Sequence, residues 1–464
     1  MKNAFMIAAT GSGCGKTTIT CALLKVLKDS GQVISAYKCG PDYIDPMFHK
    51  KVLGIPSQNL DLFFSDKQEI RDIFYHRENT DISVVEGVMG VYDGISVDCN
   101  EGSSYDLACA LDIPIVLVVN ARGMGRSLLA VIKGFQAMDE KHLIKAVILN
   151  QISPMYYKSI SSQIENTLGI TVLGYFPKCE DIKLESRYLG LMLPFEIDKL
   201  ESDIQKAGDI ISNSVDMEKL FTVSALDCRA LAKQEMAQTA TYQINFPIKK
   251  QCEKPFRIGI ARDEAFCFYY EENLRTLENL GAELIAFSPL RDSKIPDNLD
   301  GLILGGGYPE LFAEQLSSNK EMLISIQNAL QRGVPSLAEC GGFMYLHKGI
   351  KVEDKLYPMV GMIDGICEKK ERLVRFGYLS IKEKNNSFIP CNTIGIKGHE
   401  FHHYDSTNNG CDAIAVKPDN IRTWEAAHIS DTHWWGFAHL YYPSNMEFAV
   451  SFMDKCRRWR ERHR

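Results

Sequence analysis

Short apolar runs alternate with longer amphipathic stretches through the first half of the chain. The runs at residues 3–9, 33–39, 81–87 and 113–120 read "NAFMIAA", "VISAYKC", "DISVVEG" and "IPIVLVVN", and they are rich in β-branched residues. Strands that are covered by helices on both faces carry continuous apolar runs of this kind. "KAVILNQI" and "TVLGYFP" continue the series. The pattern therefore predicts a parallel α/β domain over residues 1–225.

The alternation stops between residues 226 and 255, where the sequence is polar and predicts neither a strand nor a helix. We interpret this stretch as a linker. The pattern then resumes with the strand-like runs "FRIGIARD", "ELIAFSP", "LDGLILGGG" and "VPSLAEC". Later apolar runs, such as "FGYLSIKE" and "NTIGIKGHEFHH", predict β-rich insertions, and a helix is expected over 445–463. Residues 256–464 are thus predicted to form a second α/β domain.

Composition excludes several classes of protein. The chain has 464 residues and a net charge of −7, without a basic block, so nucleic acid is not an expected partner. No run of eighteen apolar residues is present, so no membrane span is expected. The 14 cysteines form no CxxC pair, and the N-terminus does not resemble a signal peptide. We expect a cytoplasmic protein with reduced thiols.

The stretch "AATGSGCGKTT", residues 8–18, follows a predicted strand and opens a predicted helix, as a phosphate-binding loop does. Glycines let backbone N–H groups turn toward phosphate, and the helix N-terminus adds positive charge. Thr10 stands where the standard motif has glycine, so a chance glycine-rich turn is the alternative. The expected nucleotide-binding residues are Gly11, Gly13, Gly15, Lys16, Thr17 and Thr18.

Acidic residues follow two of the predicted strands. Asp42 lies in "YKCGPDYIDP", and Glu86 and Asp93 lie in "VVEGVMGVYDG". Because strand ends of a parallel sheet line the ligand crevice, these acids are expected near the phosphate loop. Each alone is more typical of a helix cap or a turn. We predict Thr17, Asp42 and Glu86 as Mg²⁺ ligands, and Asp42, Glu86 and Asp93 as participants in catalysis.

The stretch "VPSLAECGG" has the order strand, nucleophile, glycines and helix, which is typical of a nucleophile elbow. Such a turn exposes the thiol of Cys340, and the following helix is expected to lower its pKa. The backbone N–H groups of Gly341 and Gly306, the latter in "LGGGYPE", are the candidate oxyanion donors. The alternative is that Cys340 is a small buried residue at a strand end.

A thiol nucleophile needs a base, and the expected one is His439 in "GFAHLYYPSN", at the end of a late strand. The "HEFHH" segment at 399–403 suggests metal binding, but no second ligand cluster has a fitting spacing. A solvated or structural role is the expected one for that segment.

Several segments together resemble the cobyrinic acid a,c-diamide synthase family over nearly the full length. These segments are "TGSGCGKTT", "YKCGPDYIDP", "VVEGVMGVYDG", "LGGGYPE", "AECGGFMYL", "GHEFHH" and "FAHLYYPSN". The resemblance implies a dethiobiotin synthetase-like ATPase domain followed by a class I glutamine amidotransferase domain. Many class I amidotransferases carry a glutamate two residues after the histidine. Tyr441 stands there in this chain, so a Cys–His dyad is expected.

The resemblance also implies the chemistry. Cys340 would release ammonia from glutamine, with its nucleophilicity raised by His439. ATP with Mg²⁺ would phosphorylate the a and c carboxylates of cobyrinic acid, and ammonia would displace the phosphate. Hydrogenobyrinic acid and nickel-sirohydrochlorin remain open as substrates, and so does a homodimeric assembly. In a different class, a partitioning-type ATPase switch would use the phosphate loop but would have no glutaminase activity.

Overall fold

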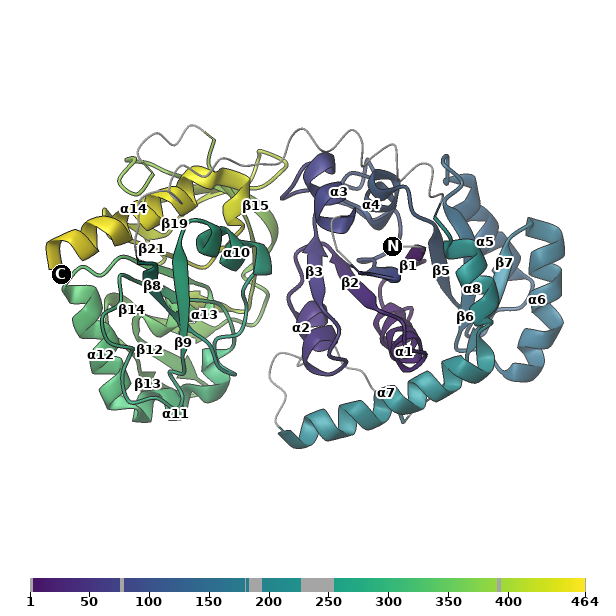
Figure 1. Ribbon diagram of the computed structural model, residues 1–464, viewed down its shortest axis with the longest axis horizontal. Helices are drawn as coiled ribbons and strands as arrows, with labels where there is room; N and C mark the ends of the chain where they lie inside the picture. The colour runs from purple at the N-terminus through teal and green to yellow at the C-terminus, as the bar shows by residue number, and fades with distance from the viewer. Residues whose placement is uncertain are drawn as a thin grey trace. The chain divides into compact units, whose positions relative to one another are not determined.

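The computed structural model describes residues 3–75, 79–179, 181, 182, 194–226, 254–389 and 394–463. The chain divides into two compact units, residues 1–243 and 244–464, and each has its own sheet and helices (Figure 1). The linker predicted over 226–255 lies almost wholly outside the described residues. Among the described residues, no helix combines the length and apolarity that a membrane span requires.

The first unit is built on a seven-stranded parallel sheet in the order β3-β2-β4-β1-β5-β6-β7. Every strand except β3 was predicted from its apolar run. β3 lies at the sheet edge and has the sequence "SQNL", which carries no β-branched residue. The strands are β1 (Asn3–Ala9), β2 (Ile34–Cys39), β3 (Ser57–Leu60), β4 (Ile82–Glu86), β5 (Ile115–Asn120), β6 (Ile144–Asn150) and β7 (Thr171–Phe176).

Helices cover both faces of this sheet, which explains the continuous apolar runs. On β1, Phe5 and Ile7 face one core while Ala4 and Met6 face the other, as the two-residue period of a strand requires. The first core is shared with α1 (Lys16–Asp29), α2 (Ile44–Lys51), α7 (Pro194–Ser214) and α8 (Met217–Ser224). The second is shared with α3 (Lys67–Tyr75), α4 (Ser104–Leu111), α5 (Ser127–Ala137) and α6 (Pro154–Leu168).

The second unit is built on a six-stranded sheet in the order β20-β21-β11-β10-β8-β9, which is parallel except for the β20–β21 pair. Its central strands match the predicted runs. The strands are β8 (Phe256–Ala261), β9 (Ala282–Phe287), β10 (Gly301–Leu304), β11 (Ser336–Glu339), β20 (His428–Ile429) and β21 (His433–Gly436).

Two smaller sheets form the predicted β-rich insertions. The order β13-β12-β14-β17 joins β12 (His347–Val352), β13 (Lys355–Pro358), β14 (Ile363–Lys369) and β17 (Tyr404–Ser406). The order β19-β18-β15-β16-β22 joins β15 (Arg375–Glu383), β16 (Ile396–His402), β18 (Ala413–Val416), β19 (Thr423–Ala426) and β22 (His439–Leu440).

Helices and the two smaller sheets cover the six-stranded sheet on both faces. One core contains α11 (Ala313–Ser318), α12 (Lys320–Gln331), α13 (Gly341–Tyr345) and the sheet of β12 and β14. The other contains α10 (Glu271–Asn279), α14 (Met446–His463) and the sheet of β15 and β16 (Figure 1). The 3-10 turns η2 (Pro309–Phe312) and η3 (Tyr442–Asn445) follow β10 and β22.

Candidate active sites

The phosphate loop connects β1 to α1, as predicted, and two of its glycines are required by the backbone. Gly13 and Gly15 have φ of 73° and 91°, a region that residues with a side chain rarely adopt. A Cβ on Gly15 would also lie 2.2 Å from Nδ2 of Asn150. Asn150 ends β6 and donates a 2.8 Å hydrogen bond to the Cys14 carbonyl. The loop is therefore fixed by a strand end of the same sheet.

Lys16 and Thr17 open α1 beneath this loop. The Lys16 ammonium donates to two backbone carbonyls, those of Gly11 at 3.4 Å and of Met89. Burial and the nearby charge of Lys38 lower the pKa of Lys16. An anion bound at the loop would oppose both effects. Thr18 is half-buried in the same first turn of the helix.

Glu86 ends β4 and lies at the centre of a buried network. Its register partners on the neighbouring strands are Ile7 and Lys38. Oε1 of Glu86 accepts hydrogen bonds from the Thr17 hydroxyl at 2.7 Å and from the Lys38 ammonium at 3.0 Å. Nε2 of His49 lies 3.7 Å from Oε2 of Glu86. Burial acts to raise the pKa of Glu86, but the charge of Lys38 and the neighbouring His49 hold that pKa below its usual range.

Asp45 completes the network by forming an ion pair with Lys38. Burial and the charge of Glu86 raise the pKa of Asp45. Burial acts to lower the pKa of Lys38, but the charges of Asp45 and Glu86 raise it well above its usual value. The buried lysine thus keeps its proton while it holds two carboxylates together.

Asp42 and Asp93 lie in the loops that follow β2 and β4, and each caps local backbone. Oδ1 of Asp42 accepts from the N–H of Ile44 at 2.8 Å, where α2 begins. Oδ2 of Asp93 accepts from the N–H of Gly90 at 2.8 Å. Their catalytic and metal roles remain predictions.

The Thr17 hydroxyl and the Glu86 carboxylate form the best candidate metal site. Their oxygens are 2.7 Å apart, and both are hard ligands of the kind that Mg²⁺ takes in proteins. The described residues contain no group of three or more His, Cys, Asp or Glu side chains that could hold a metal ion. Two protein ligands fit a Mg²⁺ that retains water and phosphate oxygens.

In the second unit, Cys340 lies at a sharp turn between β11 and α13. Its φ and ψ are 45° and −102°, an unfavourable backbone conformation for a residue with a side chain. The Cys340 N–H donates to the Gly436 carbonyl at 2.9 Å, which ties the turn to β21. A Cβ at Gly342 would lie 2.1 Å from the Leu304 carbonyl oxygen, so the turn packs directly against β10. The backbone thus has the predicted elbow geometry, but the expectation that the turn exposes the thiol is wrong, because Cys340 is buried and only 7% exposed.

The expected lowering of the Cys340 pKa is wrong. Burial raises the pKa of the thiol well above its usual range, and the charges of Glu310 and Glu400 add to the increase. The Gly341 N–H acts in the opposite direction but does not outweigh them. The helix that follows, α13, has only five residues, so its dipole is short.

Of the two glycines predicted for the oxyanion hole, Gly341 packs against the loop that contains Gly306. A Cβ on Gly341 would lie 2.9 Å from the backbone nitrogen of Gly307. A Cβ on Gly306 would lie 2.2 Å from Cε1 of His439. The loop after β10 therefore contacts both the elbow and the histidine, and any side chain at Gly306 would displace the imidazole.

His439 begins β22, where its register partner on β16 is His399. The sequence placed it at the end of one late strand, but the chain leaves the six-stranded sheet at Gly436 and enters another sheet at His439. Burial, together with His399 and His402, lowers the pKa of His439 to about 3. Nδ1 of His439 lies 4.0 Å from Oε2 of Glu339, the residue before the nucleophile.

The first four residues of the "HEFHH" segment lie in β16 and His403 directly follows it, and their side chains face in alternating directions. Glu400 and His402 are buried, with Nε2 of His402 3.7 Å from Oε2 of Glu400, whereas Phe401 and His403 are exposed. The His402 ring stacks on Phe437 at a centroid distance of 4.1 Å. The segment is thus partly structural and partly solvated.

Comparison with known proteins supports this two-part arrangement. Residues 5–191 match the family model described as a CobQ/CobB/MinD/ParA nucleotide binding domain. Residues 257–430 match a CobB/CobQ-like glutamine amidotransferase domain. A protein of Caldanaerobacter subterraneus named cobyrinate a,c-diamide synthase is 38% identical over 461 residues, which cover 98% of this chain and 99% of that protein.

The chain belongs to the cobyrinate a,c-diamide synthase family. A relative of that name from Picrophilus torridus is also 38% identical, over 458 residues that cover 98% of this chain and 99% of the relative. Another, from Priestia megaterium, is 36% identical over 457 residues, which cover 97% of this chain and 96% of that relative. Membership of this family confirms the resemblance found in the motifs, and with it the α/β fold of both units.

His49 and Glu339 are candidate site residues that the motifs did not identify. His49 is fully buried on α2 and lies 3.7 Å from Oε2 of Glu86, whereas Lys38 donates to Oε1. Glu339 is part of "AEC", but a residue at the end of a strand would ordinarily be assigned to the protein core rather than to the active site. Asp45 was visible in "YKCGPDYIDP", and its burial, only 2% exposed, distinguishes it from Asp42.

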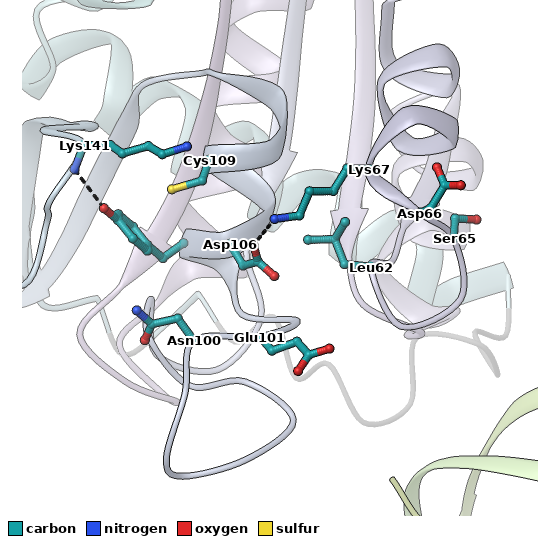
Figure 2. Close-up of a pocket in the computed structure, with 10 residues that line it drawn as sticks. Leu62, Ser65, Asp66, Lys67, Asn100, Glu101, Asp106, Cys109 and Lys141 are labelled. Atoms are coloured by element: carbon teal, nitrogen blue, oxygen red, sulfur yellow. Dashed lines mark hydrogen bonds and ion pairs between the residues drawn. The ribbon is translucent and has the colours of Figure 1, made fainter.

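A cavity of about 620 Å³ lies on the flank of the first unit, beside α3 and α4 (Figure 2). Two of the charged side chains that line it form an ion pair. The Lys67 ammonium lies 3.1 Å from an Asp106 carboxylate oxygen, and the backbone N–H of Lys141 donates to the Tyr105 hydroxyl at 3.1 Å. None of the predicted site residues lines this cavity.

Replacing Lys38 with methionine is expected to destabilise the first unit by about 3–5 kcal/mol, because it leaves Asp45 and Glu86 buried without their shared cation. Calorimetric thermal unfolding of the full chain would measure the loss. Lys133→Met, an exposed position on α5, is the matched control and should change the free energy of unfolding by less than about 0.5 kcal/mol. Equal stability of the two variants would contradict the ion-pair network.

His347, which follows α13, is expected to make the second unit acid-sensitive. Its Nδ1 donates to the Phe343 carbonyl at 2.8 Å, and its Nε2 lies 2.6 Å from the Ser406 hydroxyl. Burial lowers the pKa of His347 from 6.5 to about 4, so the unfolded chain binds more protons between these pH values. Stability should therefore fall as the pH drops from 6.5 to 4, by up to about 3 kcal/mol for this group.

Calorimetry of the full chain across this pH range tests the effect. His347→Gln keeps a donor and an acceptor but does not titrate, so its stability should depend less steeply on pH than that of the wild type. An unchanged slope would contradict the assignment of the proton to His347.

Proposed function

We propose that this protein amidates the a and c carboxylates of cobyrinic acid in cobalamin biosynthesis, using glutamine as the nitrogen donor and ATP as the energy source. The observation that carries the proposal is full-length similarity to enzymes named cobyrinate a,c-diamide synthase, in a chain whose phosphate loop and Cys340 elbow are both intact. Family membership makes it a glutamine-hydrolysing, ATP-dependent ligase.

In the second unit, the Cys340 thiolate would attack the side-chain amide carbon of glutamine. The resulting oxyanion would be stabilised by the N–H groups of Gly341 and Gly306. His439 would accept the thiol proton and return it to the leaving nitrogen, so that ammonia departs and a glutamyl thioester remains. Water would then hydrolyse the thioester to glutamate and the free thiol.

In the first unit, the γ-phosphoryl group of ATP would pass to a substrate carboxylate. A carboxylate is a poor electrophile, whereas an acyl phosphate has a good leaving group that ammonia can displace to give the amide. Lys16 and the loop N–H groups would hold the phosphates. Thr17 and Glu86 would hold the Mg²⁺ of Mg·ATP, which supplies charge neutralisation at the phosphate oxygens. The buried Lys38 lies at the same strand ends, 3.0 Å from Glu86.

The acyl phosphate step is tested with cobyrinic acid labelled with ¹⁸O in its carboxylates. Phosphoryl transfer to the carboxylate followed by attack of ammonia moves one labelled oxygen into inorganic phosphate for each amide formed. Mass spectrometry of the phosphate should find that label. Unlabelled phosphate alongside amide formation would contradict the intermediate.

The substrate is tested by offering cobyrinic acid, hydrogenobyrinic acid and nickel-sirohydrochlorin separately with Mg·ATP and glutamine. We expect cobyrinic acid to have the highest kcat/KM. Preference for another tetrapyrrole would keep the mechanism and change the substrate. ATP hydrolysis without glutaminase activity, whichever tetrapyrrole is added, would favour a partitioning-type ATPase switch instead.

A further inference from the structure

A buried carboxyl group lies beside the proposed base. Oε2 of Glu339 is 4.0 Å from Nδ1 of His439, although the two residues belong to different sheets and are 100 positions apart in the chain. Glu339 is 7% exposed and His439 is 4% exposed. Glu339 ends β11 and directly precedes Cys340, so one short segment carries both the nucleophile and this carboxyl group.

A hydrogen bond to the other carboxyl oxygen of Glu339, Oε1, holds the side chain in place. The Tyr442 hydroxyl donates to Oε1 of Glu339 at 3.1 Å. Tyr442 is itself fixed, because its backbone N–H donates to Oδ1 of Asn273 at 2.8 Å. This arrangement leaves Oε2 as the oxygen nearer to the imidazole. The imidazole also contacts the Phe268 ring in an edge-to-face arrangement, at a centroid distance of 6.3 Å.

We propose that Glu339 is a positioning residue that orients His439 and stabilises the positive charge that its imidazole gains from the Cys340 proton. The inference rests on the proposed glutaminase function. A distance of 4.0 Å is an ion-pair distance rather than a hydrogen bond, and an opposite charge at this range favours the charged imidazole. Because the contact is to Nδ1, it leaves Nε2 as the nitrogen that exchanges a proton with the thiol.

Because both side chains are buried, the electrostatic interaction between Glu339 and His439 is stronger than it would be in water. Burial raises the pKa of Glu339 to about 8 and lowers that of His439 to about 3. Either charge alone is therefore disfavoured, whereas opposite charges on the two groups stabilise each other. The carboxyl group comes from the residue before the nucleophile, and the residue two positions after His439 is Tyr441.

Glu339→Gln tests the role, because it keeps the size and the hydrogen-bonding capacity of the side chain but cannot carry a negative charge. We expect glutaminase kcat to fall about 10–100-fold, with KM for glutamine changed less than about threefold. Ammonia-dependent amidation should stay within about twofold of the wild type, since it bypasses Cys340. The limb of the kcat pH profile that reports His439 should move to lower pH.

Two further variants separate positioning from packing. Tyr442→Phe removes the hydrogen bond to Oε1 but keeps the carboxyl group, so its glutaminase loss should be several-fold smaller than that of Glu339→Gln. Glu339→Asp keeps a carboxylate at a greater distance, and it should retain more activity than the Gln variant. Neither result is expected if Glu339 only fills the core.

The proposal is overturned if Glu339→Gln has wild-type kcat and a wild-type pH profile. It is also overturned if Glu339→Gln loses ammonia-dependent amidation to the same extent, or if Tyr442→Phe loses as much glutaminase activity, since either result assigns Glu339 to packing. Failure of the proposed function itself is distinguishable, because the wild-type protein would then lack glutaminase activity.

Discussion

Replacing Cys340 with serine is expected to reduce glutamine-dependent amidation by at least about 10³-fold while ammonia-dependent amidation stays within about twofold of the wild type. The hydroxyl is a far weaker nucleophile than the thiol, but it leaves the elbow and the phosphate loop in place. Ammonia supplied in the buffer replaces the product of the glutaminase step. The two rates would be measured with the same tetrapyrrole and Mg·ATP.

The matched control is Cys411→Ser, which makes the same substitution at an exposed cysteine of the same unit and should retain both activities. If Cys340→Ser lost both activities, the thiol would be a packing residue at a strand end, as its 7% exposure alone would suggest. Retention of both activities would exclude Cys340 as the nucleophile.

Lys16→Ala, unlike Cys340→Ser, is expected to reduce both glutamine-dependent and ammonia-dependent amidation, by about 10²–10⁴-fold. Both routes need the phosphorylated carboxylate, and Lys16 is the ammonium at the phosphate loop. Glutaminase activity should persist, because Cys340 and His439 belong to the other unit. Steady-state assays of all three activities would show the pattern.

Lys25→Ala on the same helix is the control, since Lys25 forms a partly exposed ion pair with Asp29 and should be dispensable for both activities. Amidation that survives Lys16→Ala at more than a tenth of the wild-type rate would put the phosphate-loop assignment in doubt. Loss of glutaminase together with amidation would instead indicate that the substitution disturbs more than nucleotide binding.

The seven-stranded and six-stranded sheets were predictable because the burial of their strands can be recognised from sequence. A continuous apolar, β-branched run such as "IPIVLVVN" indicates a strand that is buried on both faces. β3 and the hairpin of β12 and β13 were missed because their sequences are short and mixed, and their strand conformation depends on neighbours that are already in place. The division into two α/β units is visible as a break in one pattern and its resumption.

The sites were predictable only where a backbone motif determines them. The phosphate loop and the elbow require glycines at fixed spacings, and strand-end geometry brings Glu86 to the loop. The contacts of His49 with Glu86 and of Glu339 with His439 join segments that are distant in the sequence, and no spacing encodes them. The pKa of Cys340 was mispredicted for the same reason: burial of the thiol in the folded unit raises it most, and the charges of Glu310 and Glu400, on other elements, add to the increase.

The most direct test of the account is to supply glutamine labelled with ¹⁵N in its side-chain amide, together with cobyrinic acid and Mg·ATP. Mass spectrometry of the tetrapyrrole should find two carboxyl-to-carboxamide conversions with ¹⁵N in both new amides, and no conversion when ATP is omitted. Two labelled amides would show that ammonia released from glutamine at Cys340 is used in the ATP-dependent amidation at the phosphate loop. A tetrapyrrole that remains unamidated while glutamine and ATP are consumed would contradict it.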